Sequence, residues 1–390
     1  PAGSKEATID AETNTVLDCV KEGGEFFAGS TSADIFNDVN VRITNGKYTR
    51  VFGSNEKAGT ISGAITIDIE ERGCTPIEID ELYAGGYLAP YSVYGYSTER
   101  REVKDENGNV IAELTQRIPY KKGDAGALAT PSRDPPINII SATKIGKIYG
   151  GGFMAELIGS PLINVNMTNG RISDQYVSRY PNETYPNISS TGVIPIGTIG
   201  SIYGGGYKGD IIGDTYVEIG TGEWLNFTGQ RETTDADGKV YVYNSTTKKW
   251  DWTKKVGDNT EEGTVDAKPV PARNAAKITG NVFGGGEGEA LESGTDAFYC
   301  KAAMVGIDDE GLTDPAGGTT VIIANGTVGT LDNKNKLVAG TGNVYGGGEV
   351  GRVEKNTVVT IGVTPKEGET ISNTKFKPTI WGSVFGAGKG

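Results

Sequence analysis

The amino-acid sequence predicts an all-β chain that folds as a parallel β-solenoid (β-helix) with glycine-rich corners and hairpin-bearing insertions. Three observations lead to this prediction. A glycine-rich motif recurs along the chain, the residues after each copy alternate between apolar and polar, and no helical period persists beyond a turn or two. Short stacked strands joined by glycine corners account for all three observations.

The repeated motif has the consensus Gly-x-(Ile/Val)-(Tyr/Phe)-Gly-Gly-Gly. Full copies begin at Gly146, Gly200, Gly280 and Gly342, and a shorter copy begins at Gly382. Two degenerate copies surround Phe52 and Tyr83. Each copy holds an apolar-aromatic pair in register before its glycines, which a flexible glycine-rich linker would not do. Near-identical units also favour stacked coils over an antiparallel sandwich or a propeller, because stacking places like residues above like.

The aromatic residues of the copies are therefore expected to form a ladder of offset-stacked rings. In the later copies these residues are Tyr149, Tyr203, Phe283, Tyr345 and Phe385. The glycines that follow the rings include Gly150, Gly204, Gly284 and Gly346. Such glycines suit a corner that needs a positive φ or a close approach of two backbones.

A strand is expected after each glycine run. Residues 215–219 and 357–361 read Thr-Tyr-Val-Glu-Ile and Thr-Val-Val-Thr-Ile, and residues 64–69 follow a similar pattern. This period of two is typical of a half-buried strand. One unit is thus predicted to be a short strand, a glycine-rich turn, a second short strand, another turn and a longer strand.

The solenoid is expected over residues 46–390, whereas the segment 1–45 lacks the motif and is expected to be a cap or a linker. The copies are unevenly spaced, and we assign the excess polar residues to insertions at about 93–143, 168–196, 221–276, 290–316 and 363–378. Two insertions carry hairpin signals. One has a turn at 106–109 before the strand 110–114, and the other pairs the strand 240–243 with Trp250–Trp252.

Composition excludes several function classes. The chain has 390 residues, 59 of them glycine, and a net charge of −13, which argues against a nucleic-acid binder. Histidine is absent, which removes the commonest zinc ligand. No apolar run is long enough for a transmembrane helix, and no signal peptide is apparent. The sequence begins at Pro1 without a methionine, which suggests a processed form or an excised piece. Cys19, Cys74 and Cys300 are far apart and predict small buried residues, although a Cys19–Cys74 disulfide remains open.

Catalytic and metal chemistry find little support, and we expect no enzyme and no cofactor. Carboxylate candidates for a sugar-cleaving site are Asp210, Asp214 and Glu218, or the run 308–310, but these positions also suit solvated faces and turns. No nucleophile motif accompanies them. The run 235–238, Asp-Ala-Asp-Gly, is a weak partial match to a calcium loop, so structural calcium stays an alternative.

Recognition residues are expected in the insertions. Trp250 and Trp252 alternate along one predicted strand of a hairpin, and Tyr241 and Tyr243 alternate along the other. Exposed aromatic side chains of this kind stack on sugar rings or anchor protein contacts. The simpler interpretation is that they cover the flank of the solenoid.

Residues 342–353, Gly-Asn-Val-Tyr-Gly-Gly-Gly-Glu-Val-Gly-Arg-Val, and residues 356–362, Asn-Thr-Val-Val-Thr-Ile-Gly, resemble the repeats of very large secreted surface proteins of Bacteroidota. The resemblance covers the chain from about residue 46, with the insertions outside it. It implies an extracellular, cell-surface or filament-forming adhesin-like protein with further repeats. It carries over no catalytic or binding residues.

We therefore expect a segment of a large cell-surface adhesin or filament with a structural or adhesive role. Its expected partners are further copies joined head to tail or a continuation of the same chain, together with surface glycans or proteins of host or microbe. The alternative is a polysaccharide-binding or polysaccharide-degrading β-helix protein. A phage-type fibre is a third interpretation, but no heptads are found for its coiled ends.

Overall fold

The computed structural model describes residues 8–9, 13–17, 20–73, 75–104, 110–120, 123–128, 134–167, 170–172, 193–194, 196–221, 239–244, 246–247, 249–265, 268–269, 276–289, 303–306, 317–362, 369–370 and 377–390. Within these ranges the chain is all-β and contains no helix. The strands form mainly parallel sheets, as the sequence predicts at this coarser level.

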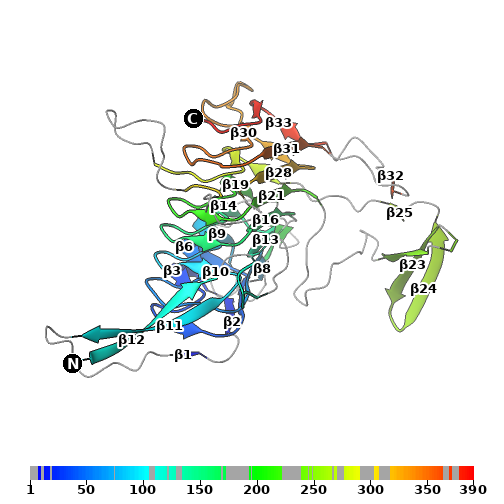
Figure 1. The fold of residues 1–390 in the computed structure, drawn as a ribbon. Coiled ribbons are helices and arrows are strands. Elements are labelled where there is room, and N and C mark those ends of the chain that lie inside the picture. The colour runs from blue at the N-terminus through cyan, green and yellow to red at the C-terminus, as the bar shows by residue number, and fades with distance from the viewer. Residues whose placement is uncertain are drawn as a thin grey trace.

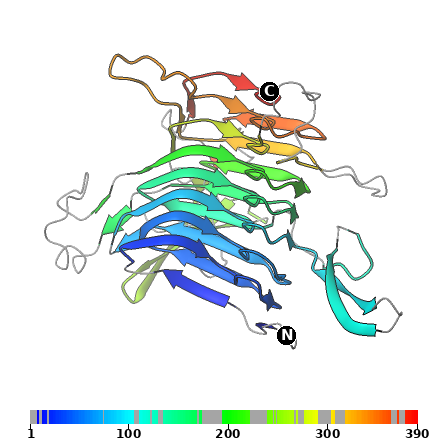
Figure 2. The ribbon, with the colours of Figure 1, turned by 90° about the vertical axis from the view of Figure 1, so that its left-hand side faces the viewer.

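Two large parallel sheets organise the fold (Figures 1 and 2). The eight-stranded sheet contains β2 (Thr13–Leu17), β5 (Val39–Ile43), β7 (Ile65–Glu70), β13 (Pro136–Ser141), β16 (Leu162–Val165), β21 (Thr215–Ile219), β28 (Thr319–Ile323) and β31 (Thr357–Ile361). The eleven-stranded sheet contains β3 (Glu22–Phe27), β6 (Gly46–Phe52), β9 (Ile77–Tyr83), β14 (Lys144–Tyr149), β19 (Thr198–Tyr203), β26 (Lys277–Ile278), β27 (Val282–Phe283), β29 (Thr327–Val328), β30 (Val344–Tyr345), β33 (Thr379–Ile380) and β34 (Val384–Phe385). Successive strands of each sheet follow in chain order, so the chain passes through both sheets and then repeats the same path. Each such repeat is called a turn below, and the turns together form the stack.

A third, shorter parallel sheet lies between the two large ones along the chain. It contains β10 (Tyr91–Ser92), β15 (Leu157–Ile158) and β20 (Ile211–Ile212). Isolated parallel bridges from Ile211 to Val305 and from Val305 to Val353 continue the same line. The smaller strands are β1 (Thr8–Ile9), β4 (Asp34–Ile35), β8 (Arg72–Gly73), β17 (Gly170–Ile172), β18 (Val193–Ile194), β25 (Lys268–Pro269) and β32 (Glu369–Thr370).

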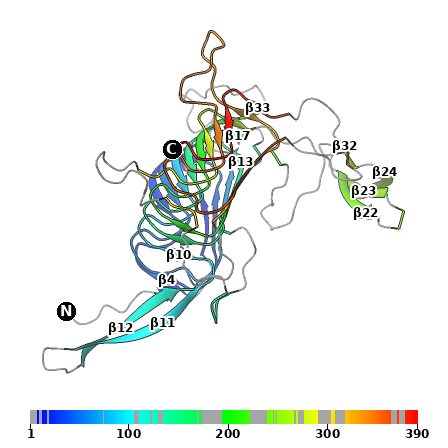
Figure 3. The same cartoon turned by 45° about the horizontal axis from the view of Figure 1, so that its top comes forward.

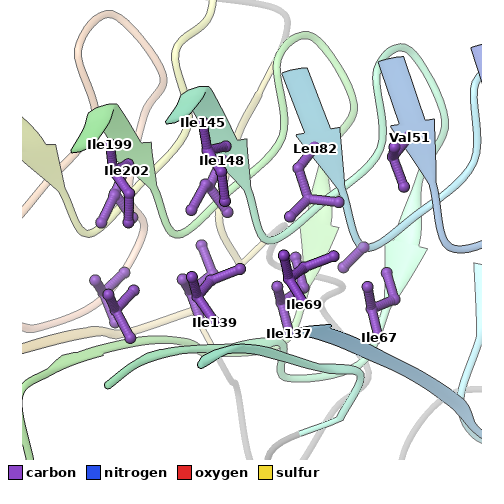
Figure 4. Close-up of a cluster of buried hydrophobic side chains, with 14 of the residues drawn as sticks. Val51, Ile67, Ile69, Leu82, Ile137, Ile139, Ile145, Ile148, Ile199 and Ile202 are labelled. Carbon is purple, nitrogen blue, oxygen red and sulfur yellow. The ribbon is translucent and has the colours of Figure 1, made fainter. Parts of the chain in front are cut away.

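The register places like residues beside like. In the eleven-stranded sheet Tyr149 lies between Tyr83 and Tyr203, and Ile145 lies between Ile79 and Ile199. The core fills the space between the two large sheets, whose apolar side chains point toward one another (Figure 4). Strands such as β21 and β28 alternate buried with half-buried residues, the pattern expected when one face meets the core. Each fully buried Ile or Val contributes roughly 1.5–3 kcal/mol through burial.

An inner ladder of aromatic rings runs along the end of the eleven-stranded sheet. Its members are Phe27, Phe52, Tyr83, Tyr149, Tyr203, Phe283, Tyr345 and Phe385. Successive ring centroids are 4.6 to 5.0 Å apart, and the ring planes differ by 3° to 10°. The spacing equals the distance between neighbouring strands, so one ring per turn stacks on the next. Phe27 extends the ladder beyond the copies recognised in the sequence.

In most turns a glycine follows the ring, and its backbone closely approaches that of the next turn, whereas Phe27 and Tyr83 are followed by Ala28 and Ala84. A Cβ on Gly150, Gly204 or Gly284 would lie 2.1 Å from the carbonyl oxygen of the equivalent glycine one turn later. These three glycines do not have positive φ values, so lack of space, and not a left-handed backbone, excludes a side chain here. The amide of Gly204 donates to the carbonyl of Phe283 at 2.9 Å, which continues the ladder of backbone bonds past the ring.

The two large sheets also run without a break across residue 45. β2, β3 and β5 belong to the segment 1–45, yet β2 pairs with β5, β5 with β7, and β3 with β6. Likewise β13 falls inside the interval 93–143 assigned to an insertion, but it pairs with β7 and β16. The excursion from the sheets is therefore shorter than that interval.

The antiparallel hairpin predicted near residue 106 is formed by β11 (Tyr96–Lys104) and β12 (Val110–Pro119), and it projects from the stack (Figures 1 and 3). Its base folds back onto an earlier turn. The Arg117 guanidinium pairs with Asp34 at 3.0 Å and lies 4.5 Å from the centre of the Phe36 ring. The excursion is thus anchored to the stack by an ion pair and a cation–π contact.

We predict that Gly204→Ala destabilises the fold by about 1–3 kcal/mol, because the added methyl group meets a backbone oxygen that has no room to move. The control is Gly24→Ala, since a Cβ on Gly24 would have no atom within 4 Å. Urea denaturation followed by circular dichroism measures both. Equal stability of the two variants would contradict the proposed close approach.

Candidate functional site

A second, outer ladder of three rings flanks the inner one. Tyr87, Phe153 and Tyr207 each follow an inner-ladder ring by four residues and stack on one another at 4.9 and 4.8 Å. They are half-buried and pack edge-on against the inner ring of the preceding turn. The contacts are Tyr87 with Phe52, Phe153 with Tyr83 and Tyr207 with Tyr149. Sequence reasoning missed this ladder, although an aromatic residue at the fourth position was a usable signal.

Later copies of the motif have glutamate at the same fourth position. Glu287 and Glu349 reach back two turns instead of stacking, and they accept hydrogen bonds from the phenols of Tyr149 and Tyr203. The Tyr203–Glu349 bond is 2.6 Å long. On the earlier turn the Tyr83 hydroxyl donates to Glu81 at 2.9 Å. Burial is the main reason that the pKa values of the Tyr149 and Tyr203 phenols lie well above the usual range. The carboxylates of Glu287 and Glu349 raise them further.

Cations complete this polar edge of the ladders. Lys147 binds Glu287 at 2.8 Å, and Lys389 binds Glu349 at 2.6 Å. Burial is the largest single influence on Glu349 and opposes its ionisation, but the hydrogen bonds from Lys389 and Tyr203 and the charges of Lys389 and Lys147 together lower the pKa of that carboxyl. Because these carboxylates are held by a phenol and an ammonium group, their chemistry is suited to joining turns.

The four aromatic residues predicted for recognition lie in a three-stranded antiparallel sheet. It contains β22 (Lys239–Asn244), β23 (Lys249–Val256) and β24 (Asn259–Val265). The register pairs Tyr241 with Trp252 and Tyr243 with Trp250, so the backbone brings all four positions together across two strands. In Figure 1 this sheet lies to the side of the stack. The side chains of Tyr241, Tyr243 and Trp250 lie outside the described residues.

Trp252 is half-buried, and its indole lies over β24. Gly263 stands opposite it in the register, and a Cβ on Gly263 would come within 2.7 Å of the indole ring. The glycine thus leaves the space in which the ring rests. On the other face of β23, Asp251 accepts hydrogen bonds from Asn244 and Thr264, each at 3.0 Å. Trp252 and the hydrogen-bonded Asp251 therefore lie on opposite faces of β23.

Two of the carboxylates considered for catalysis, Asp210 and Asp214, bind backbone amides. Asp210 accepts from the amide of Met304 at 2.8 Å, and Asp214 accepts from the amides of Gly317 and Gly318 at 2.9 Å. Burial raises the pKa of Asp210, and the Met304 bond opposes that shift. Both aspartates fasten the next turn to their own. The runs 308–310 and 235–238 lie outside the described residues.

Metal binding and membrane crossing can be assessed for the described residues. Among these residues no group of three or more His, Cys, Asp or Glu side chains is placed to hold a metal ion. The same part of the chain has no helix of the length and hydropathy needed to cross a membrane. Cys19, Cys74 and Cys300 lie outside it.

Comparison with protein-family models, with curated proteins and with solved structures gave no match for this chain.

We predict that Gly263→Val displaces the Trp252 indole from β24 and exposes it, because the new side chain fills the space under the ring. Acrylamide quenching of Trp252 fluorescence should increase in a chain whose other three tryptophans are replaced by Phe. Glu262→Ala, on the other face of the same strand, is the control. Unchanged quenching in Gly263→Val would show that the ring does not rest there.

Proposed function

We propose that this chain is a parallel β-solenoid that forms a structural and adhesive segment of an extracellular, cell-surface protein. The single observation that supports it best is the unbroken inner ladder. Eight stacked rings, one per turn, require every turn to repeat the same path. Such a stack is rigid along its axis and can be lengthened by adding turns.

The aromatic residues of the stack and those of the insertion lie in different surroundings, and this difference supports an adhesive role. The inner ladder is buried from Phe52 to Tyr345 and the outer ladder is half-buried, so both help to hold the stack together, whereas the β22–β24 sheet carries clustered aromatic positions away from it. Aromatic side chains at an accessible surface are the usual anchors for sugar rings and protein partners. The net charge of −13 favours solubility of a long extracellular body. The resemblance to surface repeats of Bacteroidota points the same way.

The proposed partners of the stack are a following turn of the same chain or a second copy joined head to tail. Within this sequence the last turn exposes the apolar side chains of Trp381, Val384 and Phe385, the last at 43 %. A turn laid on β33 and β34 would cover these side chains and pair their open edges.

The alternative of a polysaccharide-degrading β-helix has weaker support. It needs a pair of carboxylates available to a glycosidic bond. Asp210 and Asp214 are instead committed to backbone amides of the next turn. A reducing-sugar assay that found release of sugar, abolished by Asp214→Asn in a folded chain, would favour the alternative.

We predict that cysteines placed on neighbouring turns form a disulfide with the proposed register. Lys47 and Glu78 are side by side in β6 and β9, where strands are about 4.8 Å apart, a separation that a disulfide spans. In a chain without the native cysteines, Lys47→Cys with Glu78→Cys should cross-link on mild oxidation. Lys47→Cys with Lys144→Cys, two turns apart, should not. Cross-linking of the second pair alone would overturn the parallel register.

We predict that beads coated with the chain adhere to cultured epithelial cells or to immobilised glycans through the β22–β24 sheet. Adhesion should fall at least about tenfold when all four aromatic residues are replaced by Ala, if two or more contacts of about 1 kcal/mol are lost. The replaced residues are Tyr241, Tyr243, Trp250 and Trp252. The control replaces Thr253 and Glu262 by Ala on the opposite face. Equal adhesion of both variants would place recognition elsewhere.

A further inference from the structure

Glu71 is a buried acid at a corner where other turns place uncharged residues. It follows β7 and is 2 % exposed. It stands two residues after Ile69, which belongs to the column of apolar core residues in the eight-stranded sheet. Among the described residues, those two positions after the matching members of that column are Asn45, Ser141, Met167, Thr221 and Asn325, all uncharged. A carboxyl group at this corner therefore needs its own explanation.

One oxygen of Glu71 accepts three hydrogen bonds, and the other has no partner among the described residues. Oε2 accepts from the amide of Ile77 at 2.7 Å, and from the amide and hydroxyl of Thr143 at 2.8 and 2.9 Å. These bonds tie the corner to the start of β9 and to the next turn. Oε1 is buried and makes no hydrogen bond to any residue that the structure describes. A charged carboxylate with one orphan oxygen is costly to bury, whereas a neutral carboxyl group is less so.

The orphan oxygen faces the backbone of β17. A Cβ on Gly170 would lie 2.0 Å from Oε1, so the first residue of β17 rests directly against it. β17 pairs with β8, which begins at the residue after Glu71, and with β18 on its other side. The protonation state of Glu71 thus affects the contact through which this three-stranded sheet packs on the corner.

No nearby cation offsets the charge among the groups that the structure describes. Glu70 engages both Arg42 and Arg72 in ion pairs. Glu78 on β9 adds negative charge, and it stands in register with Lys144 of β14 and Lys47 of β6. Burial first, and Glu78 to a smaller extent, raise the pKa of Glu71 to about 7, although the bonds from Ile77 and Thr143 oppose the shift. On the remaining elements the charged residues are Asp68 of β7 and Arg171 of β17, and Cys74 lies outside the described residues.

We propose that Glu71 is a proton-dependent latch that holds β17, and with it β18, against β8. When the carboxyl is neutral, Oε1 tolerates the dry contact with Gly170. When the proton leaves, Oε1 draws water into that contact, and β17 and β18 separate from β8 while the two large sheets remain. The latch concerns the small sheet and is independent of the proposed adhesive role.

The raised pKa of Glu71 determines how the stability of the closed state changes with pH. An acid whose folded pKa lies above its unfolded value stabilises the closed state fully below pH of about 4.5, and this contribution is lost as the pH rises through about 7. The latch is therefore closed in mildly acidic surroundings and open in alkaline ones.

Hydrogen exchange of the amides in 170–172 and 193–194, corrected for intrinsic rates, tests the latch between pH 5.5 and 8.5. The protection of these amides should fall at least about tenfold at the higher pH, since each unit of pKa shift corresponds to a factor of ten. In Glu71→Gln the protection should not change with pH. Asp134→Asn is the matched control, because burial raises the pKa of Asp134 to about 6 at a different corner; this variant should keep the pH dependence.

Equal protection at both pH values in the unmodified chain would overturn the proposal, and so would the same loss in Glu71→Gln. If Glu71→Gln fails to fold, the pH profile of the unmodified chain and of Asp134→Asn still decides the matter. Exchange in β14 and β19, measured in the same samples, distinguishes opening of the small sheet from loosening of the whole stack.

Discussion

The structure depends on the contact between glycine backbones of successive turns. At Gly150, Gly204 and Gly284 the space for a side chain is occupied by the next turn's carbonyl oxygen, so the turns approach as closely as backbones can. This contact fixes the axial distance at one strand spacing. Flat rings placed just before the glycines must then stack at the same distance, and the inner ladder follows from it. A side chain at Gly150, Gly204 or Gly284 would disturb this contact, whereas the earlier turns place Ala28 and Ala84 at the same position.

A stack with so strict a spacing accepts insertions only where the chain leaves and returns at a corner. The aspartates at these corners show how the return is secured. Asp214 precedes β21, and its carboxylate binds the amides of Gly317 and Gly318, more than a hundred residues later. Asp210 does the same for Met304. A carboxylate that accepts backbone amides fixes the chain at its point of re-entry, whatever length lies between. Part of the acidic excess of the sequence therefore has a structural purpose.

The inner ladder could be predicted from the sequence because its determinants are local: an apolar-aromatic pair followed by glycine. The hairpin of β11 and β12 was also readable from its Asn-Gly turn. The outer ladder was missed although aromatic residues recur at the fourth position, and its packing on the ring of the preceding turn is a displacement that no single repeat reveals. β24 was missed because Thr-Glu-Glu-Gly carries no apolar alternation, and β13, which begins at Pro136, was missed because it lies inside the interval 93–143 that was assigned to an insertion. Glu71 lacks any local signal, since its partners lie on other strands and other turns.

These contacts separate the part of the molecule that holds shape from the part available for recognition. The inner rings from Phe52 to Tyr345 are buried, and Glu287 and Glu349 are held by phenols and lysines. Stack residues that carry chemistry are thus already engaged with one another. By contrast, β22–β24 join aromatic positions across strands whose polar side is satisfied internally by Asp251. A sheet that needs only one face for its own bonds can offer the other to a partner, and the proposed adhesive role rests on that asymmetry.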